Sequence, residues 1–139
     1  MSESLVSTGD QLQPVRASQS STYADSDDEF GAGNCIDGET GADRGPDGRY
    51  SLCHTNVERY PWLAIDFGKT VVVQRVEIFN RLGCCGDRTR GVQVSVSDEL
   101  PTSGSQPFQG TLLGHFGGPA ADGQHIIIPG KMMPHNCHC

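Results

Sequence analysis

The sequence has a shortage of basic residues and no long hydrophobic run, and each shortage excludes a class of function. Its 139 residues include 10 Lys and Arg against 17 Asp and Glu, for a formal net charge of −7. This balance argues against general binding to nucleic acids or anionic membranes, because both depend on basic patches. No stretch approaches the roughly 20 apolar residues that cross a bilayer. Residues 1–6 lack the charged-then-apolar pattern of a secretion signal, so we expect no export signal in this chain.

The sequence also lacks the common catalytic and metal-binding motifs. It has six cysteines but no Cys-x-x-Cys pair, which disfavours a ribbon-type zinc site and a thioredoxin-type redox site. We find no paired carboxylates at strand ends and no Ser/His/Asp arrangement, so we expect a binding protein rather than an enzyme. The six cysteines are numerous enough for several disulfide bonds, and their pairing stays open.

The residues that are abundant indicate an all-β chain. Eighteen glycines and eight prolines are typical of many short elements joined by turns. Alternation of apolar and polar residues recurs, and a helical period never develops, so several short strands in a sandwich or barrel are predicted. The expected strands cover residues 62–67, 71–79, 92–97 and 125–129.

Three further expectations concern the strands and the stretches between them. The three valines of residues 92–97 are expected to face the interior, with the polar residues outside. Residues 1–16 form a loose lead-in with room for one edge strand. Residues 102–123 form a connection that adds a loop or an edge strand, through four apolar residues: Phe108, Leu112, Leu113 and Phe116.

Reactive and charged side chains are concentrated in residues 80–88, a loop between two predicted strands. Arg81 and Arg88 stand seven positions apart there, with Cys84 and Cys85 between them. Consecutive Cα atoms lie about 3.8 Å apart, whereas ordinary disulfides span roughly 4.4–6.8 Å. A Cys84–Cys85 bond would therefore form a tight ring that freezes the loop. Geometry alone favours the alternative, in which the two cysteines pair elsewhere or remain thiols.

The two arginines and a histidine suit a ligand with several hydroxyls. A guanidinium offers a planar fork of donors that can hold two neighbouring hydroxyl groups. His54 can add a donor or an acceptor. The chemistry of these three residues suits a sugar or another polyol, a carboxylate or a sulfate, although composition alone favours the alternative. Paired surface arginines that are merely solvated or salt-bridged are the alternative.

Several segments of the chain resemble the F-type lectins (fucolectins), which are relatives of the discoidin domains of coagulation factors. The resemblance covers residues 13–131 and includes a histidine, an arginine 27 positions on, a vicinal cysteine pair and a second basic residue. The matching segments and residues are Ala17–Tyr23, Cys35–Gly38, Pro61–Gly68, His54, Arg81, Cys84, Cys85 and Arg88. It implies an all-β, jelly-roll β-sandwich of antiparallel strands with long loops at one end. A flexible lead-in (1–12) precedes this domain and an atypical tail (132–139) follows it.

The resemblance also implies a function. A lectin of this kind would recognise terminal α-L-fucose, with His54, Arg81 and Arg88 on the ring oxygen and hydroxyls and a disulfide-bonded Cys84 and Cys85 packed on the sugar. Its partners would be fucosylated glycans or glycoproteins, with membranes reached only through glycans, and a homo-oligomer is compatible with it. The implied location is extracellular, with a role in innate immunity. The alternatives are a discoidin-like lipid- or protein-binding module and a degenerate lectin fold with weak or no sugar binding.

A structural calcium ion is a further implication of the resemblance. Calcium takes six to eight oxygen ligands, and the chain offers the Asn34 carbonyl, Asp37, Glu39 and Ser51. The family's C-terminal glutamate has no counterpart, so a weakened site is expected. A plain solvated loop is the alternative.

The chain departs from the family pattern at three places. The family has an aspartate two positions after the first arginine, where this chain has Gly83; Asp87 is a hypothetical substitute. Cys53 directly precedes His54 rather than standing two positions before it, so the family's bridge to the C-terminus is not assumed. Residues 132–139 contain two cysteines and two histidines that could chelate a soft metal; a terminus without structure is the alternative.

Overall fold

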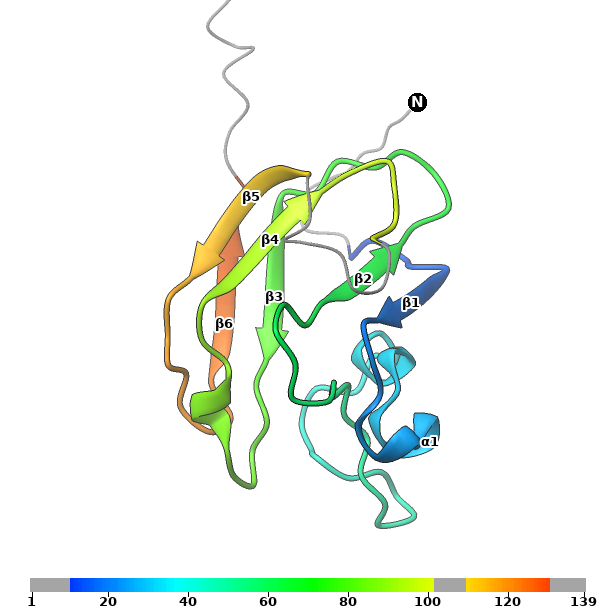
Figure 1. Cartoon of the computed structure of the whole chain (residues 1–139), viewed down its shortest axis with the longest axis vertical. Helices are drawn as coiled ribbons and strands as arrows, with labels where there is room; N and C mark the ends of the chain where they lie inside the picture. The colour runs from blue at the N-terminus through cyan, green and yellow to red at the C-terminus, as the bar shows by residue number, and fades with distance from the viewer. Residues whose placement is uncertain (1–10, 102–109, 131–139) are drawn as a thin grey trace, which may run out of the picture.

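The computed structural model describes residues 11–101 and 110–130. Within these ranges every strand pairing is antiparallel (Figure 1). The three pairs are β1 (Arg16–Gln19) with β2 (Leu63–Asp66), β3 (Arg75–Phe79) with β6 (His125–Pro129), and β4 (Val92–Val96) with β5 (Thr111–Phe116).

Among residues 11–101 and 110–130, helical structure is limited to single turns, as the absence of a helical period predicted. The described elements are the one-turn α1 (Asp27–Phe30) and 3-10 turns at Tyr23–Asp25, Ala32–Cys35 and Gly86–Arg88. Among the described residues, no helix has the length and apolar character needed to cross a bilayer. Phe108, most of the lead-in and the 132–139 tail lie outside the described residues.

Two of the strand pairs pack face to face and enclose the core. In β6, Ile126 and Ile128 are each 2% exposed, and with Ala120 they form the centre of the apolar cluster. Partly buried residues of β3, β4 and β5 surround this centre: Ile78, Val92, Val94 and Phe116. Alternation along β6 produces this arrangement, because every second side chain points to the same face. The predicted all-β sandwich of antiparallel strands is confirmed.

Two sequence expectations about the strands are wrong in detail. A register shift between Val94 and Ser95 turns the following residues over, so Val96 is 37% exposed rather than interior. The strand expected over residues 71–79 begins only at Arg75, and Val72 before it is 67% exposed. Residues 111–116, expected as a loop or an edge strand, form β5 and pair with β4.

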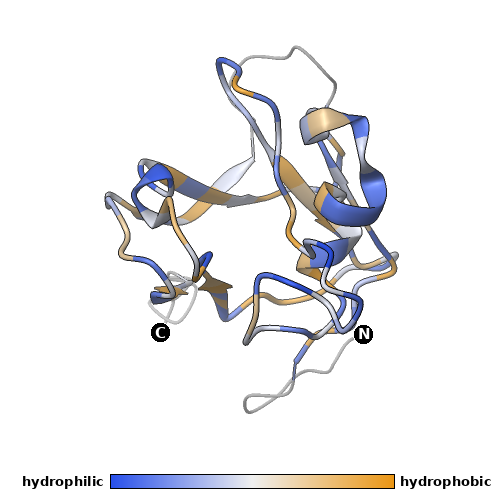
Figure 2. Cartoon of the chain, turned by 90° about the horizontal axis from the view of Figure 1, so that it is seen from below, coloured by the Kyte–Doolittle hydropathy of each residue, from blue (hydrophilic) through white to orange (hydrophobic). Residues whose placement is uncertain are grey.

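The long loops gather at one end of the molecule, the lower end in Figure 1. They comprise most of the segment between β1 and β2, which includes α1, and the connections β3–β4 and β5–β6. Figure 2 looks onto this end and shows hydrophilic stretches alternating with hydrophobic ones along the loops. The Cys35–Cys53 disulfide ties two parts of the β1–β2 segment together. This loop end contains the residues that the sequence singled out.

Candidate functional site

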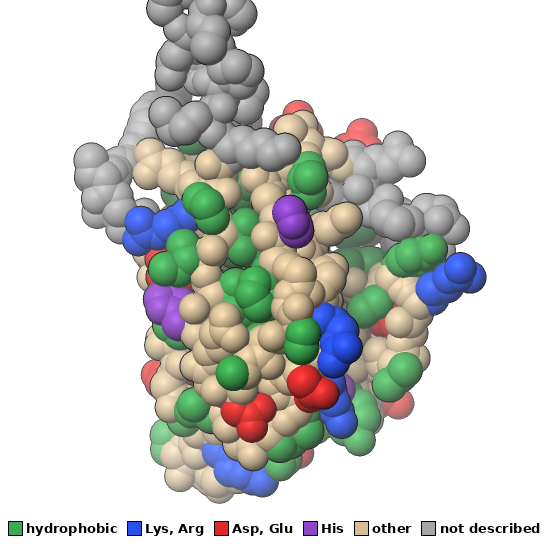
Figure 3. Space-filling model, turned by 90° about the vertical axis from the view of Figure 1, so that its left-hand side faces the viewer, with side chains coloured by type: hydrophobic (Ala, Val, Ile, Leu, Met, Phe, Trp, Pro, Cys, Tyr) green, Lys and Arg blue, Asp and Glu red, His purple; other side chains and the backbone are tan. Residues whose placement is uncertain are grey.

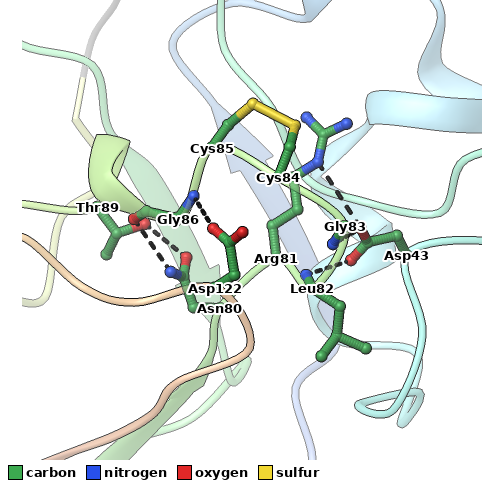
Figure 4. Close-up of polar contacts among 10 residues, drawn as sticks. All are labelled: Asp43, Asn80, Arg81, Leu82, Gly83, Cys84, Cys85, Gly86, Thr89 and Asp122. Atoms are coloured by element: carbon green, nitrogen blue, oxygen red, sulfur yellow. Dashed lines mark hydrogen bonds and ion pairs between the residues drawn. A yellow bond between two sulfur atoms is a disulfide. The ribbon is translucent and has the colours of Figure 1, made fainter.

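A small hairpin over residues 43–51 forms one wall of the candidate site. Arg44 and Tyr50 form an antiparallel bridge, and the Ser51 N–H donates to the Asp43 carbonyl at 2.9 Å. The Arg44 guanidinium lies 3.8 Å from the centre of the Tyr50 ring, which is cation–π geometry. These contacts hold Asp43 at the base of the hairpin, with its side chain directed at the loop that follows β3 (Figure 4).

That loop, residues 80–88, is attached to its surroundings on two sides by carboxylates. The Asp43 side chain accepts hydrogen bonds from the Leu82 and Gly83 amides, at 2.7 and 2.6 Å. On the other side, the Asp122 side chain accepts from the Gly86 amide at 2.7 Å. Bonds between carboxylates and backbone N–H groups are charge-assisted and short. The two aspartates therefore fix the loop at both flanks of its cysteine pair (Figure 4).

The cysteine pair at the tip of this loop is a disulfide, Cys84–Cys85. Cys85 has φ +66°, in the left-handed region that non-glycine residues seldom adopt. Ordinary disulfide spacing argued against this bond, and the structure shows that a turn at Cys85 accommodates it. Cys53 pairs with Cys35, which answers the question of its partner. Cys137 and Cys139 lie outside the described residues.

Arg81 lies beside Asp43 rather than beside the expected substitute. Its Nε atom is 3.8 Å from the Asp43 carboxylate, an ion pair beyond hydrogen-bond reach, and this buried Nε has no hydrogen-bond partner among the described residues. The Arg81 guanidinium also lies 5.2 Å from the Tyr50 ring centre. The hypothesis that Asp87 takes this role is wrong, because the Asp87 carboxylate lies 3.7 Å from Arg90 instead.

His54 lies in an aromatic cluster behind the hairpin. Its ring centre is 4.6 Å from that of Tyr23 and 5.7 Å from that of Phe30. The Nδ1 atom lies 2.6 Å from the Thr55 carbonyl oxygen. Because a carbonyl can only accept, Nδ1 carries the hydrogen in this contact, and Nε2 of the neutral ring is then an acceptor. This contact fixes the orientation of the ring, and no described residue forms a hydrogen bond with Nε2.

Arg88 closes the 3-10 turn that follows the disulfide, and it is exposed. Its guanidinium forms no ion pair and no hydrogen bond with the rest of the described chain. No hydrogen bond or ion pair between described residues joins His54 to either arginine. The structure therefore places the predicted ligand-binding residues on adjoining loops of one end without linking all of them directly.

A cavity of about 610 Å³ lies between the hairpin and the arginine loop, within the roughly 300–1,000 Å³ usual for small-molecule sites. It includes Arg81 and Cys84 of the predicted residues, but not His54, Cys85 or Arg88. Its lining is Gly41, Ala42, Asp43, Arg44, Tyr50, Arg81, Leu82, Gly83 and Cys84. Asp43, Arg44 and Tyr50 are the charged and aromatic lining residues that sequence reasoning missed. They lie more than 30 positions before Arg81 in the sequence, so no short motif connects them with it.

The four predicted calcium ligands are brought together only in part. The Asp37 carboxylate accepts from the Glu39 amide at 2.8 Å and lies 3.5 Å from the Ser51 hydroxyl. The Asn34 side-chain amide donates to the Asp28 and Leu52 carbonyls, and the Asn34 carbonyl stays a predicted ligand. Within residues 11–101 and 110–130 no three His, Cys, Asp or Glu side chains converge on a metal-binding position. The oxygen donors of Asp37 and Ser51 are chemically suited to calcium.

Comparison with known proteins places this sequence in a family. Residues 34–111, more than half of the chain, match the profile of the NedA-like, galactose-binding domain of the F5/F8 type C group. A fucolectin of Anguilla anguilla is 27% identical over 84 residues, which are 60% of this chain and 51% of that protein. Fucolectin-5 of Anguilla japonica is 30% identical over 83 residues, 59% of this chain and 42% of that protein. The match thus spans about half the length of these relatives. The chain belongs to the family of NedA-like, galactose-binding domains, within the discoidin-like group.

Proposed function

We propose that this chain is a carbohydrate-binding lectin domain, without catalytic activity, that recognises terminal α-L-fucose. The observation that carries the proposal is the rigid Cys84–Cys85 disulfide, which stands next to Arg81 at the rim of a cavity in the loop end. Sugars offer polar edges and one apolar face, and this site offers a guanidinium fork beside an apolar sulfur surface. The similarity to proteins named fucolectins supports the choice of fucose.

In the proposed complex each side chain has a separate role. Arg81 and Arg88 donate to ring oxygen and hydroxyl groups, and the free Nε2 of His54 pairs with a further hydroxyl. The disulfide packs on the apolar face of the sugar. Because the loop is already fixed by Asp43 and Asp122, little conformational entropy would be lost on binding.

Calorimetric titration with L-fucose tests the proposal directly. We expect saturable binding of L-fucose and no detectable binding of L-rhamnose, a 6-deoxy-L-sugar with a different hydroxyl arrangement, because the arginine forks require a particular pair of hydroxyls. The same protein on a glycan array should prefer fucosylated glycans. Equal responses to both sugars, or an array without fucoside preference, would contradict fucose recognition.

The discoidin-like alternative has one observation in its favour. Val57 projects fully from the 56–60 loop, and Tyr60 in the same loop is 43% exposed, as in a loop that inserts into a lipid surface. Glu58, next to Val57, argues against insertion into an anionic surface because it is acidic. It accepts hydrogen bonds from the Ser20 and Ser21 hydroxyls, which lower the Glu58 pKa and keep the carboxylate charged. On the face shown in Figure 3, basic side chains are scattered rather than gathered. Pelleting with phosphatidylserine vesicles at physiological salt would support the alternative; we expect none.

We propose calcium as a structural ligand of the loop around Asp37 and Ser51. Chelation with EDTA is then expected to lower the thermal unfolding midpoint by several degrees, because a ligand bound only to the native state stabilises it by mass action. Differential scanning fluorimetry with and without excess calcium measures this shift. The matched control is Asp37→Asn, whose midpoint should no longer respond to EDTA. Superimposable wild-type curves in both conditions would exclude the ion.

The proposed setting is extracellular. Two disulfides lie within the described residues, Cys35–Cys53 and Cys84–Cys85, and disulfides persist mainly in oxidising compartments. Fucosylated glycans or glycoproteins would be the partners there, and a homo-oligomer would raise their binding through avidity. In this proposal residues 13–131 form the lectin domain, flanked by the lead-in and the tail.

A further inference from the structure

We propose that Asp43 is the positioning residue of the sugar site and that its charge lowers the affinity of the cavity for acidic ligands. This inference rests on the proposed function, since it concerns the same cavity. It is carried by three contacts: the two backbone amides that Asp43 accepts from, and the guanidinium beside it.

Asp43 sets the conformation of the arginine loop. Both oxygens of its carboxylate are engaged, Oδ1 by the Leu82 amide and Oδ2 by the Gly83 amide. These amides immediately follow Arg81, so their position determines where the Arg81 side chain leaves the backbone. The Ser51 amide in turn donates to the Asp43 backbone carbonyl and so holds the Asp43 backbone in the hairpin. The 43–51 hairpin therefore determines, through Asp43, where Arg81 lies.

Asp43 also compensates charge within the cavity. The lining carries two guanidiniums, those of Arg44 and Arg81, and one carboxylate, that of Asp43. The Asp43 and Arg81 side chains are only 14% and 21% exposed, so water screens their interaction less than at an open surface. With Asp43 ionised the lining has a net charge of +1. Without the Asp43 charge it would be +2, so Asp43 reduces the attraction of the cavity for anions.

The close approach of the Asp43 carboxylate requires a residue without a side chain at position 83, and this residue is Gly83. A Cβ atom at position 83 would lie 2.9 Å from Asp43 Oδ2, closer than carbon and oxygen approach without one of them moving. The φ angle of Gly83 is not in the left-handed region, so alanine there is conformationally allowed. A side chain at position 83 would therefore act on the site through Asp43, by pushing its carboxylate away from the amides and from Arg81.

The first test measures L-fucose affinity by calorimetry in Asp43→Ala, Asp43→Asn and Gly83→Ala. Asp43→Ala is expected to weaken binding about tenfold or more, the effect of losing charge-assisted contacts. Gly83→Ala should weaken it in the wild-type background but add little to Asp43→Ala, since both changes act on the same carboxylate. Additive losses, or unchanged affinity in Asp43→Ala, would overturn the positioning role.

The second test separates charge compensation from mere structural support. Sodium sulfate, at constant ionic strength set with sodium chloride, is expected to compete only weakly with L-fucose for the wild type. It should compete at least several-fold more strongly in Asp43→Asn, which keeps the shape of the side chain but removes its charge. If sulfate competes equally with both proteins, or with neither, the selectivity role is excluded.

A third readout needs no sugar and so distinguishes failure of this inference from failure of the proposed function. In amide hydrogen exchange followed by NMR, the Leu82 and Gly83 amides should be protected in the wild type and exchange faster in Asp43→Ala, while the Gly86 amide, bound to Asp122, should not change. If this pattern is found and fucose does not bind, only the proposed ligand is wrong. If the two amides exchange equally in both proteins, Asp43 does not position the loop.

Discussion

Replacing Arg81 with alanine is expected to weaken L-fucose binding by about 10- to 100-fold, the largest effect of any single change at the site. The loss of a charge-assisted hydrogen bond costs roughly 1.5–3 kcal/mol, and each 1.4 kcal/mol is about tenfold in affinity. The substitution also leaves the little-exposed Asp43 carboxylate without its nearby positive charge. Calorimetric titration of the variant against the wild type measures the difference.

Two further variants make the Arg81 result interpretable. Arg81→Lys keeps the charge but loses the planar fork, so its affinity should lie between those of the wild type and the alanine variant. Arg75→Ala is the matched control, because Arg75 is exposed on β3 and pairs with Glu77 outside the cavity; its affinity should equal that of the wild type. An Arg81→Ala protein that is folded and binds L-fucose as tightly as the wild type would remove this arginine from the site.

The largest expected effect on stability is that of Ile128→Ala. Ile128 is 2% exposed in the centre of the core, and its Cγ2 atom occupies the space next to Gly114 of β5, where a Cβ atom added to the glycine would approach it to 2.6 Å. Truncation should lower the free energy of unfolding by about 2–5 kcal/mol, through lost burial and the cavity left behind. This is a large share of the roughly 5–15 kcal/mol that stabilises a typical domain. Urea unfolding followed by tryptophan fluorescence measures it.

The neighbouring residue supplies the control for this experiment. Ile127 has the same side chain in the same strand but is 55% exposed on the outer face, so Ile127→Ala should change the unfolding free energy by only about 0.5 kcal/mol. Equal losses for the two variants would mean that the alternation in β6 does not separate inside from outside.

Much of the framework follows from local patterns. Alternation in residues 62–67 predicted β2, because side chains along a strand point alternately to two faces. A short apolar run that ends at a proline predicted β6. The alternation argument failed for Val96, where an extra residue of the partner strand β5, Leu113, shifts the register between β4 and β5. A bulge of this kind depends on the partner strand, and residues 92–97 alone contain no sign of it.

The candidate site divides in the same way. The sequence by itself determined that His54, Arg81 and Arg88 stand in register with a vicinal cysteine pair, since spacing along one chain is all that this resemblance requires. Only the tertiary structure decided that Cys53 pairs with Cys35 and that the carboxylate beside Arg81 is Asp43. Asp43 reaches its partners across about 40 residues and binds backbone amides. Every residue except proline has such an amide, so the sequence of the loop does not show which amides Asp43 binds.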